Sequence, residues 1–326
     1  MGRRERLGSM REVLRTTDLV RLSWLQALLA ESRIETLVLD GHTSVLEGLI
    51  GAIPRRLMVE DEDYERAIGV LRDTGEIAVP AASKPADSLL GGRIALRQPA
   101  TGYRVAIDPV LLAAAVPPTA GRVLDVGCGV GAASLCYAAR VPEARITGLE
   151  LRADWARLAE ENARVNGMAG RFAVVCGDLL QPPPGLPPGS FDEVMANPPY
   201  LPANRADMRQ PPADAPATVE GEARLADWIA FCLVMASPNG GITLIQRADR
   251  LDEILVHLHG KAGGVTVFPL WPRASGGADA RRVIVRARKG SKAPMRLAAG
   301  LVLHRDDGAN SDAAERVLRD GAALDL

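Results

Sequence analysis

Asn197, Pro198, Pro199 and Tyr200 form the segment of this chain whose residue types are best suited to chemistry. The side-chain oxygen of Asn197 and the main-chain carbonyl of Pro198 are hydrogen-bond acceptors. Each proline fixes φ, so the acceptors are held in place before any reaction begins. The Tyr200 ring adds an aromatic face, and stacking on such a face is worth roughly 1–3 kcal/mol for a nucleic acid base.

This segment suits the activation of a nitrogen that is conjugated with a ring or a carbonyl group. The lone pair of such a nitrogen is delocalised, so the nitrogen is a poor nucleophile. Two fixed acceptors can draw both N–H bonds out of the plane and free the lone pair for attack, without a strong general base. A structural turn after the apolar run 191–196 is the alternative interpretation.

A glycine-rich loop lies about seventy residues upstream. It follows the apolar run 122–126, which we expect to be a strand, and it precedes a segment with a helical pattern. Glycine lets the chain turn sharply and approach a ligand without a Cβ clash, and the first N–H groups of the helix form a polar rim. The candidate binding residues of this loop are Asp125, Gly127, Gly129 and Gly131.

Two further carboxylates stand where the next two predicted strands end. Glu150 closes the run 146–150, and Asp178, followed by Leu179, comes just after the run 172–176. An acidic side chain at the end of the second strand can accept hydrogen bonds from both hydroxyls of a ribose. The alternative for both residues is that they cap helices.

In this order and at this spacing, the two segments resemble those of the class I S-adenosylmethionine (SAM) dependent methyltransferases, in the branch that methylates planar, conjugated nitrogens. The resemblance implies that SAM is the cofactor, with Asp125 at its amino acid portion, Glu150 at its ribose and Asp178 at its adenine. Leu179 and Asn197 complete the expected cofactor contacts, and residues 197–200 carry the catalytic step. A dehydrogenase is the alternative for the glycine loop alone.

A region ahead of the glycine loop narrows the substrate. Residues 98–104 (Gln-Pro-Ala-Thr-Gly-Tyr-Arg) and 107–113 (Ile-Asp-Pro-Val-Leu-Leu-Ala) resemble bacterial tRNA adenine-N6 methyltransferases that act beside the anticodon of a valine tRNA. The similarity spans about 89–308 and implies methylation of the N6 amine of an adenine in RNA, with tRNA as the expected partner. Within it, Asp108 either borders the cofactor pocket or is an N-cap with Pro at N1.

Two alternatives to RNA methylation stay open. Enzymes that methylate glutamine side chains of peptide release factors carry the same four residues as 197–200, because a carboxamide is also planar and conjugated. From another class, the chain could be a SAM-binding regulator, although a regulator has no need for the segment 197–200.

The length of 326 residues allows two domains. Residues 10–74 show strand and helix patterns in the order βαβ(α)βα, with a short helix at 43–50. They resemble a small α+β, ferredoxin-like domain of bacterial proteins named for signal transduction. Binding of a protein partner through this domain and a role as a spacer are both open. Residues 75–88 have the composition of a linker, and 1–9 and 309–326 are interpreted as terminal tails.

The main domain, 89–308, alternates strands with helices, which predicts a doubly wound α/β fold with helices on both faces of a mostly parallel sheet. We expect seven strands, the last two forming an antiparallel hairpin at the sheet edge, as in the methyltransferase version of this fold. The predicted strands are 122–126, 146–150, 172–176, 191–196, 241–246, 265–270 and 281–287. The predicted helices are 108–116, 131–140, 153–166, 222–236 and 250–260.

The net charge of −1 gives no overall attraction to nucleic acid, so any such surface must be local. Residues 273–296 hold eight basic residues and one acid, Asp279, which indicates either contact with an RNA backbone or a solvated strand edge in an Arg-rich protein. The Pro-rich loop 201–221 follows the candidate catalytic segment and could close over a substrate or be disordered.

The four cysteines, at 128, 136, 176 and 232, form no C-x-x-C pair and are interpreted as free thiols in a reducing compartment. No metal site is expected. The sequence shows neither a signal-peptide pattern nor an apolar run of the ~18 residues that a membrane helix needs. We therefore expect a cytoplasmic protein without membrane association.

Overall fold

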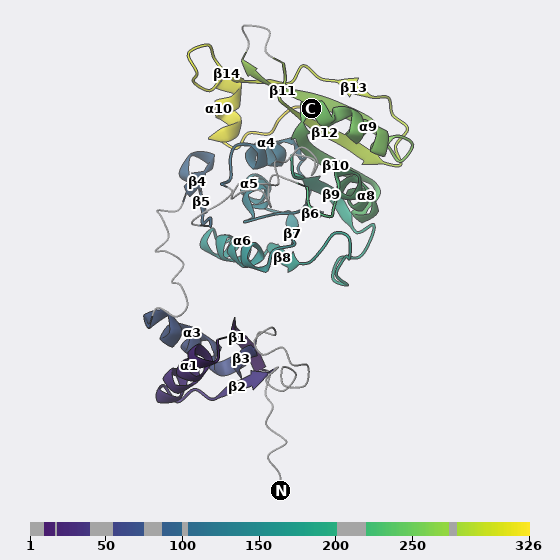
Figure 1. Ribbon diagram of the computed structural model, residues 1–326. Helices are drawn as coiled ribbons and strands as arrows, with labels where there is room; N and C mark the ends of the chain where they lie inside the picture. The colour runs from purple at the N-terminus through teal and green to yellow at the C-terminus, as the bar shows by residue number, and fades with distance from the viewer. Residues whose placement is uncertain are drawn as a thin grey trace. The chain divides into compact units, whose positions relative to one another are not determined.

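The computed structural model describes residues 10–16, 18–39, 55–74, 87–99, 104–200, 220–273 and 279–326. The chain divides into two compact units, Met1–Ala82 and Ser83–Leu326 (Figure 1). No helix in the described parts of either unit is long and apolar enough to cross a membrane.

The small unit contains a split βαβ arrangement, the core of ferredoxin-like folds. Strand β3 lies between β1 and β2 and pairs antiparallel with both. Leu22, Leu25 and Leu29 recur at helical spacing and pack with Leu57 of β3 and Leu71 of α3 in one core. The elements are β1 (Met10–Thr16), α1 (Leu19–Glu31), β2 (Thr36–Leu39), β3 (Arg55–Glu60), η1 (Asp61–Asp63) and α3 (Tyr64–Asp73).

Two predictions for the N-terminal part meet the limits of the described residues. The helix expected at 43–50 lies outside them, and so does most of the linker expected at 75–88. Residues 87 and 88 are not linker: they begin β4 (Asp87–Leu89), which forms a hairpin with β5 (Ile94–Leu96) across the turn η2 (Leu90–Gly92).

The large unit is built on one sheet with the strand order β8-β7-β6-β9-β10-β12-β11-β13, and β14 also pairs with β11. The first five strands of this order are parallel, and β12 is antiparallel to both β10 and β11. The strands are β6 (Arg122–Val126), β7 (Arg145–Glu150), β8 (Phe172–Cys176), β9 (Phe191–Ala196), β10 (Ala236–Arg247), β11 (Ala262–Arg273), β12 (Arg282–Lys289), β13 (Arg296–Leu297) and β14 (Leu301–His304).

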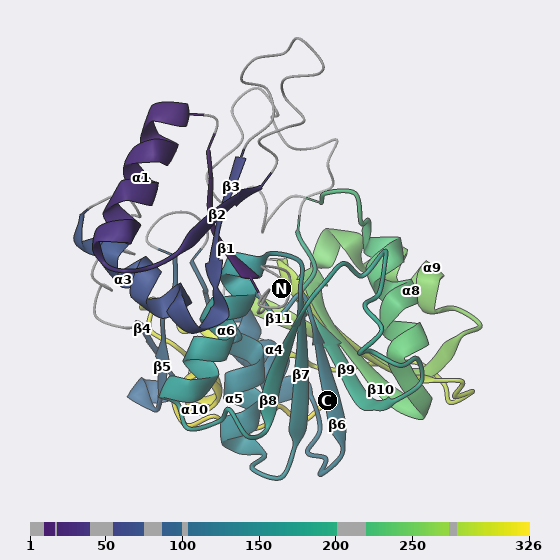
Figure 2. The same ribbon diagram turned by 90° about the horizontal axis from the view of Figure 1, so that it is seen from below.

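Helices cover both faces of this sheet (Figure 2). Successive strand residues point to opposite faces, so Val123 of β6 packs in one core with α4 and α5, and Leu124 packs in a second core with α8. The doubly wound α/β fold expected from the sequence is therefore confirmed. The helices are α4 (Asp108–Ala115), α5 (Ala132–Arg140), α6 (Ala153–Val165), α8 (Leu225–Met235), η4 (Ala248–Arg250), α9 (Leu251–Leu258) and α10 (Asp312–Leu318).

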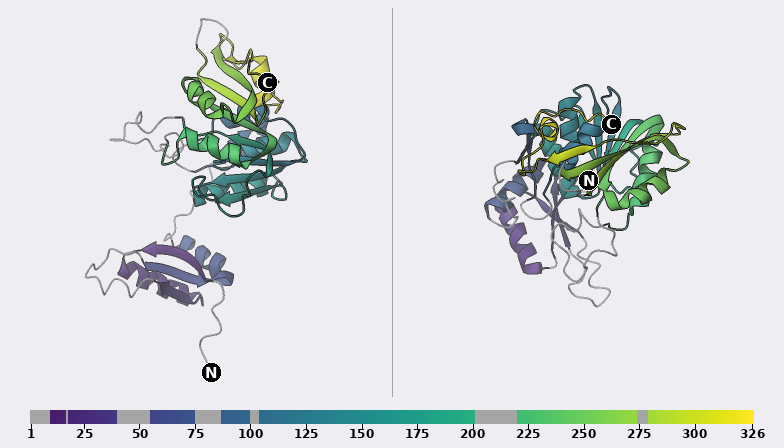
Figure 3. Two further views of the ribbon diagram at one scale, coloured as in Figure 1. Left: turned by 90° about the vertical axis from the view of Figure 1, so that its right-hand side faces the viewer. Right: turned by 90° about the horizontal axis from the view of Figure 1, so that it is seen from above.

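The C-terminal part corrects two expectations. The sheet has nine strands in the described residues instead of seven, because β13 and β14 add to β11 beyond the expected hairpin. Residues 309–326 are not a tail: α10 buries Ala314 and Val317, and the Leu324 N–H donates to the Ala114 carbonyl of α4 at 2.8 Å. Figure 3 shows this yellow segment at the same end of the large unit as the green strands of the C-terminal part, and α10 contacts β14 and α4. A seven-residue helix with two buried apolar residues carries too short a pattern to be recognised in the sequence.

A buried side-chain amide joins the segment after β5 to the glycine loop. Asn162 of α6 is fully buried, and its oxygen accepts a hydrogen bond from the Arg97 N–H at 2.8 Å. Its amide nitrogen donates to the carbonyls of Arg97 and Val130 at 3.0 and 2.9 Å. The side chain thus acts like a piece of strand, and it fixes residues 97–99 beside the loop that begins at Gly127.

The packing of α10 leads to a first prediction. Val317→Asn should lower the free energy of unfolding by about 2–3 kcal/mol, because it places an amide among the apolar neighbours of α10. Arg316→Asn, a change at the adjacent exposed residue, should alter it by no more than about 0.5 kcal/mol. Urea unfolding followed by circular dichroism measures both, and equal stability of the two variants would contradict the buried position of α10.

Candidate functional site

The candidate site lies where four parallel strands end on one edge of the sheet. Val126 of β6 is level with Leu149 of β7 and Ala196 of β9, and Glu150 is level with Cys176 of β8. The segments that follow these strands therefore line one cavity of about 460 Å³. The predicted site residues that line it are Asp125, Gly127, Gly129, Glu150, Asp178, Leu179, Asn197, Pro199 and Tyr200.

Two predicted site residues stand behind the cavity wall. Gly131 has φ +88° at the start of α5, and a Cβ there would lie 2.9 Å from the Phe172 ring, so close packing explains this glycine. Pro198 is buried, and its carbonyl lies 3.4 Å from Nε2 of Gln246.

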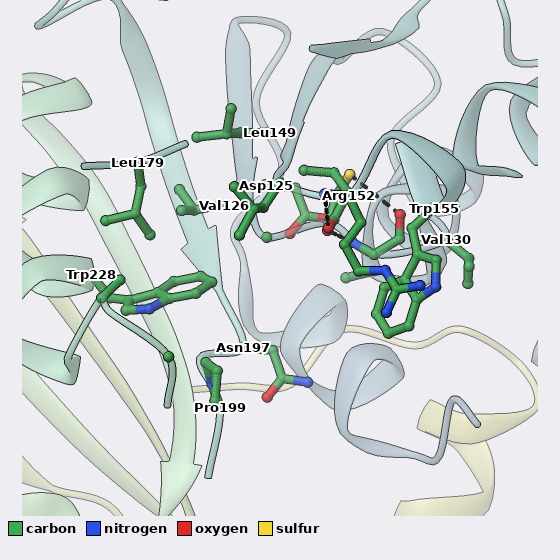
Figure 4. A pocket seen from close by; sticks show the side chains of 18 of the residues that line it. Asp125, Val126, Val130, Leu149, Arg152, Trp155, Leu179, Asn197, Pro199 and Trp228 are labelled. Carbon is green, nitrogen blue, oxygen red and sulfur yellow. Dashed lines mark hydrogen bonds between the residues drawn. The ribbon is translucent and has the colours of Figure 1, made fainter. Parts of the chain in front are cut away.

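Gly127 is required both by its backbone and by a side chain from α8. Its φ is +67°, and a Cβ at this position would lie 2.4 Å from Cη2 of Trp228. Trp228 was not predicted, because nothing local in the sequence relates it to the loop one hundred residues earlier. The indole lines the cavity next to Leu179, and Trp155 and Arg152 lie on the opposite side (Figure 4).

Glu150 is fixed by main-chain donors. Its two carboxylate oxygens accept hydrogen bonds from the N–H groups of Gly129 and Arg152, both at 2.9 Å. The carboxylate is 6% exposed, and this burial raises its pKa. The alternative that Glu150 caps a helix is wrong, because α6 has Arg152 at its N-cap position and no side-chain cap.

Asp178 makes a local turn and also lines the cavity. Its Oδ1 accepts a hydrogen bond from the Leu180 N–H at 2.8 Å. No described helix begins at this point, so the helix-cap interpretation fails here as well.

Asp125 is almost completely buried. It is 2% exposed, and its Oδ2 accepts a hydrogen bond from the Ser134 hydroxyl at 2.7 Å. Burial, with a smaller contribution from the nearby charge of Glu150, raises the pKa of the carboxyl to about 7, although the hydrogen bond from Ser134 acts to lower it.

Asn197 provides an acceptor that the protein leaves unused. Its Oδ1 is buried and has no hydrogen-bond partner among the described residues. Such an atom is rare in folded proteins, because an unpaired buried acceptor costs about 1–3 kcal/mol. The Pro199 carbonyl, in contrast, accepts a hydrogen bond from Nε2 of Gln246 at 3.1 Å, which ties the segment to β10.

Tyr200 is held by residues from two other parts of the chain. Its hydroxyl donates to Oδ2 of Asp108 at 2.6 Å, and the Arg282 guanidinium carbon lies 4.4 Å from the centre of its ring. Neither expectation for Asp108 is correct: Ile107 occupies the N-cap of α4, and Pro109, not Asp108, lines the cavity.

The basic segment 273–296 is partly used inside the protein. Arg282 contacts Asp108, Arg286 pairs with the buried Glu193, and the Lys289 ammonium donates to the Ala236 carbonyl at 2.8 Å. Arg282 and Arg286 flank the buried apolar run 283–285 of β12 and are only partly exposed. The exposed basic residues of the described segment are Arg273, Arg281, Arg288, Lys292 and Arg296.

Two family models match the chain. Residues 106–209 match the "Methyltransferase small domain", and residues 10–75 match the family described as "Putative prokaryotic signal transducing protein". The resemblance proposed for each part of the sequence is thereby confirmed.

Curated relatives fall into two groups. The tRNA1(Val) (adenine(37)-N6)-methyltransferase of Aeromonas hydrophila is 33% identical over 212 residues, which are 64% of this chain and 86% of that protein. The corresponding enzyme of Porphyromonas gingivalis is 31% identical over 53% of this chain and 70% of that protein. The release factor glutamine methyltransferase of Deinococcus radiodurans is 45% identical, but over only 26% of this chain and 29% of that protein.

A solved structure is similar in fold to the large unit and is also described as a methyltransferase. A protein of Agrobacterium tumefaciens described as a predicted O-methyltransferase has a TM-score of 0.56 and 28% identity, and the match covers 67% of this chain and 98% of that one. The protein is a SAM-dependent N-methyltransferase, and it belongs to the same family as the bacterial tRNA1(Val) (adenine(37)-N6)-methyltransferases.

Proposed function

We propose that the protein transfers a methyl group from SAM to the exocyclic N6 amine of an adenine in RNA, and that this RNA is a tRNA. The observation that carries the proposal is the buried Oδ1 of Asn197, which has no hydrogen-bond partner among the described residues, in a cavity that Tyr200 also lines. Such an acceptor, in one cavity with an aromatic side chain, suits a planar substrate that donates N–H.

The residues of the cavity fit SAM. Glu150 and Asp178 each retain lone pairs for further donors, so Glu150 would hold the ribose hydroxyls and Asp178, with Leu179, the adenine. Asp125 would meet the amino acid portion, whose ammonium group favours a carboxylate. When bound, SAM supplies a methyl group on a positively charged sulfur, which is a good leaving group.

Asn197 would then act on the target amine. Its Oδ1 would accept one N–H bond, which would bend the amine towards tetrahedral geometry and localise its lone pair. The Pro198 carbonyl, expected from the sequence to accept the other N–H bond, is buried behind the cavity wall and accepts from Nε2 of Gln246 at 3.4 Å. SAM held by Glu150, Asp178 and Asp125 would supply the methyl group to this nitrogen, and the amine would lose one proton to water. The Gln246 contact and the two prolines keep the loop rigid, so the acceptors need little reorganisation.

Glutamine methylation of a protein is the second candidate. Its support is the 45% identity to the release factor glutamine methyltransferase of Deinococcus radiodurans, and that match extends over 86 residues. The relatedness to tRNA methyltransferases extends over 212 residues and favours RNA. A partner for residues 10–74 remains a prediction.

The contact between Gly127 and Trp228 gives a prediction for the cofactor. Gly127→Ala should weaken SAM binding by about 10-fold or more, because its Cβ would displace the indole that lines the cavity. Gly189→Ala is the matched control: its φ is +69°, and nothing lies within 4 Å of its added Cβ. Calorimetric titration with SAM measures both, and equal affinities would refute the role of this contact.

The buried Asp125 predicts how stability depends on pH without cofactor. Its pKa is about 7 in the folded protein and 3.8 in an ordinary setting, so its stabilising contribution is complete below pH ~4 and is lost as pH rises through 7. Asp125→Asn should remove this loss, up to about 1.4 kcal/mol per pH unit. Urea unfolding at pH 5 and pH 8 compares the two proteins, and parallel changes in both would contradict the buried acid.

The next prediction concerns catalysis. Asn197→Ala should lower kcat by about 100- to 1,000-fold, as for loss of one fixed catalytic hydrogen bond, with SAM affinity within about twofold of the wild type. The assay uses methyl-labelled SAM with unmodified total tRNA and, separately, a recombinant release factor. Mass spectrometry of nucleosides should find N6-methyladenosine with the wild-type enzyme. Label in the release factor alone would replace the RNA proposal by the glutamine one.

A further inference from the structure

Asp108, Tyr200 and Arg282 form a closed cluster that joins three separate elements. The Tyr200 hydroxyl and the Arg282 Nε both donate to Oδ2 of Asp108, at 2.6 and 3.1 Å. The Arg282 guanidinium also lies over the Tyr200 ring at 4.4 Å. Each member therefore contacts both of the others, although they are 92 and 174 residues apart from Asp108 along the chain.

The cluster restrains the Tyr200 ring in two ways. The hydroxyl hydrogen bond fixes the direction of the ring axis, since Asp108 is 8% exposed and is carried by the packed helix α4. The guanidinium, a flat cation over an aromatic face, resists rotation of the ring about that axis. Arg282 is itself held, because its Nε bonds Asp108 and its Nη1 donates to the Arg281 carbonyl at 3.3 Å.

Tyr200 lines the cavity, whereas neither Arg282 nor Asp108 does. We infer that the ring face covered by the guanidinium is turned away from the cavity, so that the cluster holds the rest of the ring towards it.

We propose that Asp108 and Arg282 are positioning residues, which lock the Tyr200 ring in the orientation that stacks on the target adenine. This inference rests on the proposed function. Neither residue touches the reacting atoms; both act through Tyr200. Pre-ordering the ring spares the substrate the entropy cost of ordering it on binding.

The residue types suit the task. A guanidinium is planar and can cover a ring while its Nε bonds a carboxylate, whereas the ammonium of lysine is a point charge that cannot do both. Arg282→Lys should therefore lower kcat/KM as Arg282→Ala does, although it retains the positive charge. Arg281, adjacent and exposed with the same charge, is the matched control.

The first measurement needs no substrate. The chain has four tyrosines, so 19F NMR of the full chain labelled with 3-fluorotyrosine gives few signals, and Tyr200→Phe identifies the one from Tyr200. In Arg282→Ala this signal should shift, while the other signals, and all signals in Arg281→Ala, stay in place. An unmoved Tyr200 signal in Arg282→Ala would overturn the proposal. Because Arg282 is partly exposed, this variant tests the cluster even if Asp108→Asn fails to fold.

The second measurement is kinetic. With unmodified tRNA, Arg282→Ala and Asp108→Asn should lower kcat/KM by about 10-fold, near the lower end of the range for loss of one base stack, with the KM for SAM within about twofold. Arg281→Ala should retain wild-type kcat/KM. Equal losses in Arg281→Ala and Arg282→Ala would indicate simple attraction of RNA phosphates and overturn the positioning role.

The two proposals fail in different ways. A wild-type enzyme that forms no N6-methyladenosine in tRNA overturns the proposed function, whatever the NMR spectra show. A wild-type enzyme that forms it, together with a shifted Tyr200 signal and unchanged kcat/KM in Arg282→Ala, overturns the positioning role alone.

Discussion

The parallel pairing of β6 with both β7 and β9 is the constraint from which the site follows. Parallel strands end on the same edge, so the residues after Val126, Leu149 and Ala196 must meet there. A shift of one residue in either pairing would turn the side chains of a strand to the opposite face of the sheet. Residues that now pack in one core would then face the other, and both cores would be disrupted. The buried alternation of Val123 and Leu124 between those cores fixes the register. The position of the cavity is thus a consequence of packing.

Burial of polar groups at this edge of the sheet costs free energy unless each group forms hydrogen bonds. The protein supplies hydrogen bonds to some of these buried groups and not to others. Main-chain N–H groups satisfy both oxygens of Glu150, and Ser134 satisfies one oxygen of Asp125. Within the described part of the chain, Oδ1 of Asn197 is left without a hydrogen-bond partner. Natural sequences depart from local consistency mainly at functional sites, where a ligand provides the missing interaction. The uneven compensation therefore separates supporting residues from those available to cofactor and substrate.

Residues in the last third of the chain mainly hold the catalytic segment in place, and fewer of them are available for an RNA-binding surface. Gln246 of β10 donates to the carbonyls of Pro198 and Pro199 within the catalytic segment, and the Arg282 guanidinium of β12 lies over the Tyr200 ring. The basic residues of β12 looked like a nucleic acid contact, yet several of them are internal partners of acidic or main-chain groups. An exposed remainder, which includes Arg288 and Lys292, is left for a polyanion. The described residues that line the cavity all belong to Ser83–Leu326.

The sequence alone determined the features that depend on neighbours along the chain. The alternation of strands and helices, the glycine loop, the carboxylates Glu150 and Asp178 at strand ends, and the segment 197–200 all carry local patterns. Hydrophobic periodicity and glycine conformation act over a few residues, so they can be recognised without knowing the fold.

Tertiary structure alone decided which distant residues complete the site. Trp228 meets Gly127, Gln246 meets Pro199, and Asp108 meets both Tyr200 and Arg282, across separations of 47 to 174 residues for the hydrogen-bonded pairs. Such contacts depend on strand order and helix packing, and they leave no periodic signal. The same holds for α10, whose two buried residues become a core only when α4 lies against them.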